Sequence, residues 1–218
     1  DGTASAAILL DALPRFGLTV DYYVPDRFKE GYGLNKEAIN HLHDTGTDLV
    51  LTVDNGIVSF DEVDYANQLG LDMIITDHHS PRDTLPRAVA VVDPKVTWRD
   101  QPKAYDEHFC LRDRRRRLYP FLDLCGAGVA FKLVEALGQT FPADLPTGQE
   151  KWLLDLVAIA TVSDIVTLAD ENRALVYWGL KVLQKTRRPG VKALVAVAGL
   201  DLTEGDSQAI GYMLGPRL

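Results

Sequence analysis

The stretch "LVLTVDNGIVSFDEVDYANQLGLDMIITDHH", residues 49–79, has the pattern of one strand–helix–strand unit. Its two outer parts are short, nearly continuous apolar runs, which are typical of strands buried in a parallel sheet. Its middle part begins at Ser59, carries Glu62 three residues later as a capping box, and ends at Gly70, which predicts a helix. The stretch therefore predicts an α/β fold with a parallel sheet flanked by helices.

The same alternation extends outward on both sides of this unit. Asn35 is a candidate N-cap for one neighbouring helix, and Gly17 is placed to end another. The further elements predicted in the first half are helices at 3–17 and 35–46 and strands at 18–24 and 87–94. Strands and helices that alternate in this way favour a single sheet layered with helices.

The second half of the chain has a different pattern. Residues 97–119 hold many charges and no clear period, so they are predicted to form a long loop or insertion. Helices are then predicted at 126–141, 149–166, 171–186 and 190–200, the last preceded by Pro189 in a favourable position. We therefore expect one catalytic domain with an α/β part (1–95), an insertion (96–120) and a mainly helical part (121–218).

Composition limits the class of protein. With 46% hydrophobic and 25% charged residues, the 218-residue chain can build a sizeable core. The net charge of −8 argues against a surface coated in positive charge for nucleic acid, although a local basic groove stays open. No apolar run approaches the roughly 18 residues of a membrane span. The absence of a secretory signal and the spacing of the two cysteines favour a cytoplasmic protein, with Cys125 packed as a small hydrophobe.

Two polar clusters follow buried strands, "TVDNG" at 52–56 and "TDHHS" at 76–80. The carboxyl ends of parallel strands form the ligand-binding edge of such sheets. Neighbouring residues of a strand point to opposite faces, so the rings of His78 and His79 converge only if the chain turns there. One histidine could then bind a metal while the other faces substrate, and Asp77 could orient a ring as an outer carboxylate.

Asp164 lies in the apolar segment "AIATVSDIVTL", where a carboxylate is costly unless it is ionically satisfied. Together with Asp54, His78 and His79 it makes a ligand set that suits Mn²⁺ or Mg²⁺ better than structural zinc. Two such ions about 3.5–4 Å apart suit in-line phosphoryl hydrolysis. Two structural alternatives stay open: Asp54 could serve only the turn, and Asp164 could only cap a helix that ends before it.

Several segments, in this order, resemble the DHH phosphoesterase superfamily, which is named for the triplet seen here as Asp77–His78–His79. Within it the similarity is greatest to the bacterial RecJ branch of single-strand-specific 5′→3′ DNA exonucleases. The matching segments are "DGTASAAIL", "PDRFKEGYGLN", "TVDNGI", "TDHH", "LCGAGVAFKL", "ATVSDIV", "ENRALVYWGL", "TRRPGVKAL" and "GPRL".

The resemblance implies a role for each residue of the site. Asp54 matches the acid that bridges two metal ions, and His78 and Asp164 match further ligands. His79 matches a histidine close to the scissile phosphate, and Asp77 matches the supporting acid. The resemblance places a further pair of metal-binding aspartates just upstream of Asp1, which is then not a ligand of that pair. It also implies later DHHA1 and OB-type domains, which are absent from residues 1–218.

The implied activity is hydrolysis of single-stranded DNA from a 5′ end with Mn²⁺ or Mg²⁺, in DNA repair or recombination. A repair helicase and a single-strand-binding protein are the implied protein partners. The candidate DNA-binding residues are Arg27, Arg114, Arg115, Arg116, Arg117 and Arg217. Two alternatives remain: a DHH-family pyrophosphatase or oligonucleotide phosphodiesterase, and a non-catalytic replication scaffold related to RecJ.

Overall fold

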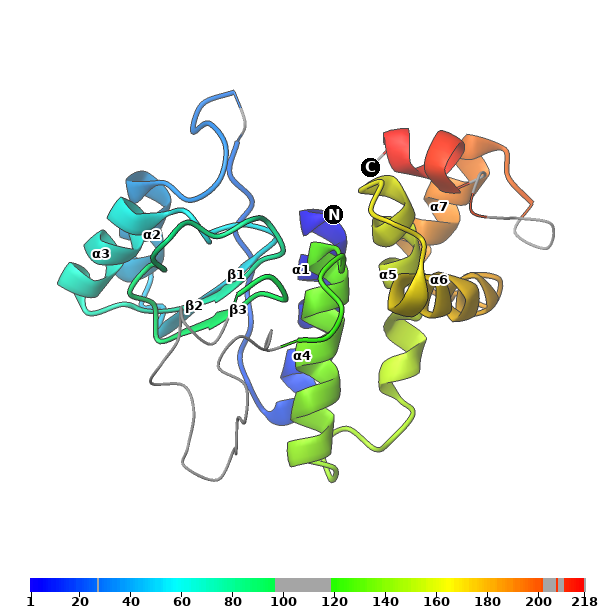
Figure 1. The fold of residues 1–218 in the computed structure, drawn as a ribbon, viewed down its shortest axis with the longest axis horizontal. Helices are drawn as coiled ribbons and strands as arrows, with labels where there is room; N and C mark the ends of the chain where they lie inside the picture. Colours follow the sequence, from blue (N-terminus) through cyan, green and yellow to red (C-terminus); the bar gives the residue numbers. More distant parts are fainter. Residues whose placement is uncertain (27, 97–118, 202–206, 208–209, 218) are drawn as a thin grey trace. The chain divides into compact units, whose positions relative to one another are not determined.

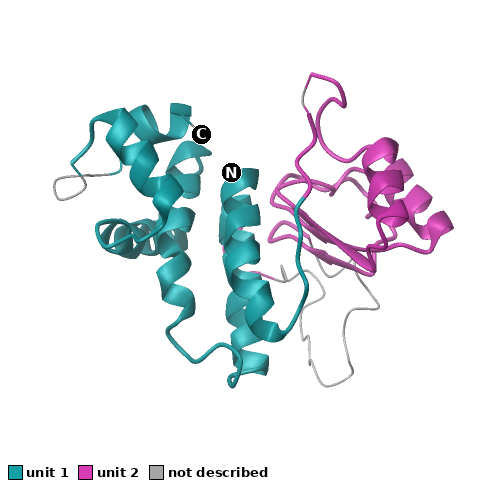
Figure 2. Cartoon of the chain, turned by 180° about the vertical axis from the view of Figure 1, so that it is seen from behind, with its two compact units in different colours: residues 1–22, 123–218 teal, residues 23–122 magenta. Residues whose placement is uncertain are grey.

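A computed structural model of the chain describes residues 1–26, 28–96, 119–201, 207 and 210–217. The chain divides into two compact units, shown in teal and magenta in Figure 2. Unit 1 comprises Asp1–Tyr22 and Asp123–Leu218, and unit 2 comprises Tyr23–Leu122. The first helix therefore belongs with the helical second half. The loop predicted at 97–119 lies almost wholly outside the described residues.

Unit 2 is built on a parallel sheet. Its strands are β1 (Leu49–Val53), β2 (Asp72–Thr76) and β3 (Ala90–Val92), and they lie in the order β1-β2-β3. Both pairs of strands are parallel. The parallel sheet predicted from the apolar runs is therefore confirmed.

The core of unit 2 lies between this sheet and two helices, α2 (Lys36–Asp44) and α3 (Phe60–Leu69) (Figure 1). Met73 and Ile75 point from β2 into a buried cluster that includes Ile39 of α2 and Val63 of α3. In a strand, alternate side chains point to the same face, and in a helix, side chains three or four residues apart do so. The buried apolar residues follow both patterns. The packing of the two helices on the sheet therefore fixes the position of the carboxyl ends of its strands.

The ends of these helices test the predicted caps. Asn35 accepts a hydrogen bond from the backbone N–H of Ala38 at 2.7 Å, so the predicted N-cap is confirmed. Ser59 precedes α3, but its side chain makes no capping bond, and the predicted capping box is wrong. Gly70 ends α3 with φ of 75°, a left-handed conformation that glycine adopts without strain.

The strand predicted at 18–24 is absent. These residues have no regular structure, and Leu18, Tyr22 and Val24 are all more than half exposed. Their β-branched and aromatic composition favours a strand, but a strand also needs a hydrogen-bonding neighbour and a surface to pack on. The segment instead crosses from unit 1 to unit 2, whose boundary falls between Tyr22 and Tyr23.

Unit 1 is helical. Its main helices are α1 (Gly2–Ala12), α4 (Gly126–Thr140), α5 (Leu154–Ser163), α6 (Asp170–Leu183) and α7 (Pro189–Ala198). Short helical turns are η1 (Leu13–Phe16), η2 (Glu150–Leu153), η3 (Ile210–Leu214) and η4 (Gly215–Arg217). The helix predicted at 149–166 is thus η2 followed by α5. None of the helices in the described part of the chain is long and apolar enough to cross a membrane.

The apolar helix α5 is the centre of unit 1, with nearly all of its side chains buried. It packs closely on α6 at Gly179, where a Cβ atom would stand 2.3 Å from the carbonyl oxygen of Leu154. Cys125 is fully buried at the start of α4 and contacts the hydroxyl of Thr161 in α5, so its prediction as a small core residue is confirmed. Burial raises the pKa of this thiol.

Candidate metal centre

A carboxylate follows each of the three strands of unit 2. Asp54 comes directly after β1, Asp77 directly after β2 and Asp93 directly after β3. Because the strands are parallel, the three carboxylates lie at one edge of the sheet. This is the edge at which the sequence predicted a ligand site.

Asp77 is the buried centre of this edge, with 1% of its surface exposed. Its Oδ2 accepts the backbone N–H of Ile57 at 2.9 Å, which ties the loop after β1 to the end of β2. Its Oδ1 accepts the backbone N–H of His78 at 2.7 Å and of His79 at 3.2 Å. A carboxylate with this many donors is held in place, and the chain around it is fixed.

The ring of His79 completes the set of groups around Asp77. Its Nδ1 lies 2.7 Å from Oδ1 of Asp77, and its side chain is 60% exposed. A proton on Nδ1 is therefore shared with the buried carboxylate, which leaves Nε2 directed away from it. The chain turns at this point as the sequence required, because the ring centroids of His78 and His79 lie only 4.4 Å apart.

His78 is buried and faces Asp54 across the edge. Its Nε2 lies 3.0 Å from Oδ1 of Asp54, and their side chains are 8% and 19% exposed. Asp54 has φ of 58°, a left-handed conformation that aspartate tolerates better than most residues. The conformation lets the chain turn as soon as β1 ends.

One ligand atom from each of Asp54, His78 and His79 lies within 4.8 Å of the other two. Imidazole nitrogen and carboxylate oxygen together suit divalent ions of the Mn²⁺ type. The residues therefore fit a metal ion, and the buried Asp77 behind His79 supplies the outer carboxylate that such ligands usually have.

Two threonines brace the loop that carries Asp54. Thr76 donates its hydroxyl proton to the carbonyl oxygen of Thr52 at 2.6 Å, and Thr52 donates its own to the carbonyl of Asn55 at 2.8 Å. Gly56 has φ of 112°, and a Cβ there would stand 3.0 Å from the Thr52 hydroxyl. The "TVDNG" cluster is therefore a rigid turn. Asp54 can serve this turn through its backbone and still offer its carboxylate to a metal ion, so the two interpretations of Asp54 are compatible.

Asp93 is a residue that the motifs alone did not single out. It is 7% exposed, and its Oδ2 is buried and accepts no hydrogen bond from any of the described residues. Burial raises the pKa of Asp93 to about 6, with the nearby charge of Asp77 adding to the effect. Its signal was present in the sequence, since it follows β3 as Asp54 and Asp77 follow their strands.

Asp164 and Asp1 belong to unit 1. Asp164 is the C-cap residue of α5, half-buried, so it lies just past the helix end as the structural alternative proposed. It is followed by Ile165, which has φ of 61° and is 90% exposed. Asp1 accepts the backbone N–H groups of Gly126 and Ala127 at 2.6 and 2.8 Å, at the start of α4. A carboxylate is favourable there because of the helix dipole, and the role of Asp164 as a ligand stays a prediction.

The candidate DNA-binding arginines are mostly outside the described residues, which leave out Arg27 and the run Arg114, Arg115, Arg116 and Arg117. Arg217 is exposed and donates to the carbonyl oxygen of Met213 at 2.6 Å. Beside Arg27, Glu30 accepts hydrogen bonds from the Tyr23 hydroxyl at 2.5 Å and the Asp26 backbone at 2.9 Å. The first residue of the "EGYGL" segment is therefore bonded to residues that precede the segment.

Comparison with known proteins gives consistent results. The family model "DHH family, N-terminal domain" matches residues 1–161. The single-stranded-DNA-specific exonuclease RecJ of Bacillus subtilis is 42% identical over the whole chain, and that of Escherichia coli is 40% identical. The chain spans 24% and 36% of the lengths of these two relatives. A crystal structure of exonuclease RecJ bound to manganese matches with a TM-score of 0.76 at 31% identity, over 98% of this chain and 48% of that one.

Proposed function

The chain belongs to the DHH family, and from that premise we propose that it is the catalytic core of a metal-dependent exonuclease that degrades single-stranded DNA from the 5′ end. The observation that carries the proposal is the group of Asp54, His78 and His79 at the carboxyl edge of the sheet, with ligand atoms within 4.8 Å of one another. The names of the relatives supply the substrate class.

Asp54 and His78 would hold a divalent ion, Mn²⁺ or Mg²⁺, at this edge. Such an ion supplies Lewis-acid stabilisation of charge on phosphoryl oxygens and lowers the pKa of a water nucleophile. Asp54 is positioned by its rigid turn, and His78 by the bond from its backbone N–H to Asp77. Further ligands proposed from the family are Asp164 and a pair of aspartates upstream of Asp1.

His79 would act on the substrate. Its Nδ1 shares a proton with Asp77, so its exposed Nε2 can donate a hydrogen bond to a phosphate oxygen when the ring is protonated. Asp77 accepts the Nδ1 proton and thereby fixes the orientation of the ring, so that Nε2 stays on its exposed side. Asp77 acts through His79 and the backbone, as a positioning residue.

We propose that the protein works in the cytoplasm, where a repair helicase or a single-strand-binding protein would supply its substrate strands. A role in DNA repair or recombination follows from the same similarity.

The test uses the full-length protein with Mn²⁺ and DNA strands labelled at either end. We expect early release of mononucleotides from a 5′ label, retention of a 3′ label in long products, and little action on a duplex. Asp54→Ala and His79→Ala should abolish hydrolysis, whereas His43→Ala, which removes an exposed histidine at the end of α2, should not. Full activity in His79→Ala, or equally fast hydrolysis of pyrophosphate, would overturn the proposal.

A further inference from the structure

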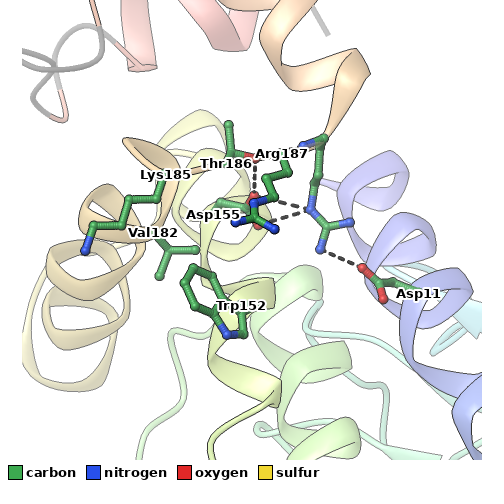
Figure 3. Close-up of a pocket in the computed structure, with 8 residues that line it drawn as sticks. Asp11, Trp152, Asp155, Val182, Lys185, Thr186 and Arg187 are labelled. Carbon is green, nitrogen blue, oxygen red and sulfur yellow. Dashed lines mark hydrogen bonds and ion pairs between the residues drawn. The ribbon is translucent and has the colours of Figure 1, made fainter.

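Unit 1 contains a pocket that the proposed chemistry does not use. It has a volume of about 780 Å³ and lies between η2 and the C-terminal end of α6. Figure 3 shows Trp152 and Val182 below, with Lys185, Thr186 and Arg187 above them. A volume of this order is within the range of pockets that hold small molecules or single groups of a polymer, about 300–1,000 Å³.

The inner wall of the pocket is closed by a buried ionic network. Asp155 is 1% exposed, and its Oδ2 accepts the hydroxyl of Thr186 at 2.8 Å and Nε of Arg188 at 3.2 Å. Nη2 of the same arginine lies 2.8 Å from Oδ2 of Asp11. Since these acids and this arginine satisfy one another, the wall does not offer a free carboxylate for a metal or a free guanidinium for an anion.

The rim of the pocket is different. Trp152 is 53% exposed, which is unusual for so large an apolar side chain. Lys185 and Arg187 are exposed, and neither has an ion-pair partner within the described ranges of the chain. The rim thus joins an accessible ring to two available cations, on a protein with a net charge of −8.

The surface continues along α6 from the pocket. Trp178 and Val182 are four residues apart and share one face of α6, and Lys185 lies in the turn two residues after the helix ends. Trp178 is 56% exposed and packs edge-to-face on Tyr177, with ring centroids 5.2 Å apart. Nζ of Lys181 lies 4.8 and 5.7 Å from the ring centroids of Tyr177 and Trp178.

We propose that this rim, with the adjoining face of α6, binds single-stranded nucleic acid. A base stacks on Trp152 over Val182, Lys185 and Arg187 contact the backbone phosphates, and a neighbouring base reaches Trp178. Exposed aromatic rings interleaved with cations are the features by which proteins bind single strands without reading sequence. Trp178 and Val182 are four residues apart, about 6 Å along α6, a length that a strand of one or two nucleotides can cover.

The inference rests on the proposed function, because that function makes single-stranded DNA the substrate, and it adds a contact in unit 1. The test measures binding of an oligothymidylate of about 12 nucleotides to the full-length protein in a metal chelator, so that no hydrolysis occurs. Quenching of tryptophan fluorescence reports stacking, and fluorescence anisotropy of a labelled strand gives the affinity. The variants are Trp152→Ala, Trp152→Phe and the pair Lys185→Glu with Arg187→Glu.

Loss of one stacked base should weaken binding about tenfold in Trp152→Ala, with a smaller loss in Trp152→Phe, which keeps a ring. The charge-reversed pair should also lower the slope of log affinity against log salt by about 1.4, for two phosphates at about 0.7 each. The matched control is Lys36→Glu with Arg87→Glu, which makes the same change in net charge on two exposed side chains of unit 2. It should leave the Trp152 quenching unchanged.

Wild-type affinity and salt slope in both sets of rim variants would overturn the inference. So would an acidic peptide that quenches Trp152 while the oligonucleotide does not, because the surface would then fit a protein partner. These outcomes are separate from the fate of the proposed function, which depends on hydrolysis and on Asp54. Asp54-dependent hydrolysis without any effect at Trp152 would remove the inference alone.

Discussion

The carboxyl edge of the sheet in unit 2 and the pocket of unit 1 are both organised by a buried aspartate, and they differ in what neutralises it. Asp77 accepts three backbone N–H groups and the Nδ1 of His79. Asp155 is neutralised by Arg188, a permanent cation, and by Thr186. Each of the two aspartates exposes 1% of its surface.

The difference decides which ligands each region can take. Backbone amides and imidazole rings surround the sheet edge, and no lysine or arginine among the described residues forms an ion pair with Asp54, which suits a divalent ion. The pocket is lined by three cations, Lys185, Arg187 and Arg188, against two carboxylates, Asp11 and Asp155, and this excess of positive charge suits an anion. A buried aspartate therefore indicates neither kind of site until its partners are known.

The largest effect is expected where the acid is a direct ligand. Asp54→Asn keeps the side-chain shape and a residue type that tolerates positive φ, so the fold should be unchanged. Loss of an outer partner of a metal ligand costs about 10–100-fold in affinity or activity, so loss of a ligand should cost at least about 100-fold. Initial rates of nucleotide release measure this loss. A variant rate within about threefold of the wild-type rate would contradict the ligand role.

Removing the neutralised acid of the pocket should instead affect stability. Asp155→Asn leaves the partly buried Arg188 with Asp11 alone, and we expect a loss of about 3 kcal/mol in the free energy of unfolding. Thr186→Val, which removes one hydrogen bond to the same carboxylate, should cost about 1 kcal/mol. Urea denaturation measures both, and a loss below that of Thr186→Val would show that the ion pair does not hold the wall.

Asp93 lies near Asp77, but its carboxylate accepts a single hydrogen bond within the described part of the chain, from the backbone N–H of Lys95 at 2.7 Å. Burial raises the pKa of Asp93 from 3.8 to about 6, so the folded state binds a proton that the unfolded state has lost between these values. Stability should therefore be highest below about pH 4 for this group and should fall as the pH rises to about 6.

Asp93→Asn removes the charge and with it this dependence. In a metal chelator the variant should be more stable than wild type by about 2 kcal/mol at pH 8, and equal to it near pH 4. Thermal unfolding at both pH values makes the measurement. A destabilised variant at pH 8 would mean that the ionised carboxylate has a partner in the folded protein.

The smallest effect on stability is expected at Ile165, which shares a left-handed backbone conformation with Asp54. Asp54 and Ile165 have φ of 58° and 61°, but only the first is of a type that adopts this conformation readily. Ile165→Gly should therefore stabilise the chain by about 1 kcal/mol, and Ile165→Ala, which keeps the Cβ, by much less. An unchanged midpoint in urea for the glycine variant would show that the conformation carries no strain.

The periodic parts of the fold could be predicted from sequence. The apolar runs that became β1 and β2 and the helices from Gly126 to Ala198 follow local patterns that depend little on distant contacts. The strand predicted at 18–24 failed because β propensity says nothing of whether a neighbouring strand exists. The capping box at Ser59 failed for a similar reason, since the residue types were right but the side-chain geometry was not.

The site could be predicted in part. Asp54, Asp77, His78 and His79 were identifiable because strand ends in a parallel sheet share an edge. The sequence could not show which aspartate would be buried and bonded, and although Asp93 follows a strand as Asp54 and Asp77 do, its burial depends on the folded chain. Trp152 is far in sequence from Lys185 and Arg187, so only the folding of η2 beside the end of α6 brings the three to one pocket.

The central claim is that the sheet edge in unit 2 holds a catalytic divalent ion, and calorimetric titration with Mn²⁺ tests it most directly. We expect Mn²⁺ to bind at this edge through Asp54 and His78. His78→Ala should lower that affinity at least about tenfold, and His43→Ala should leave it unchanged. Equal Mn²⁺ affinity in wild type and His78→Ala would contradict the account.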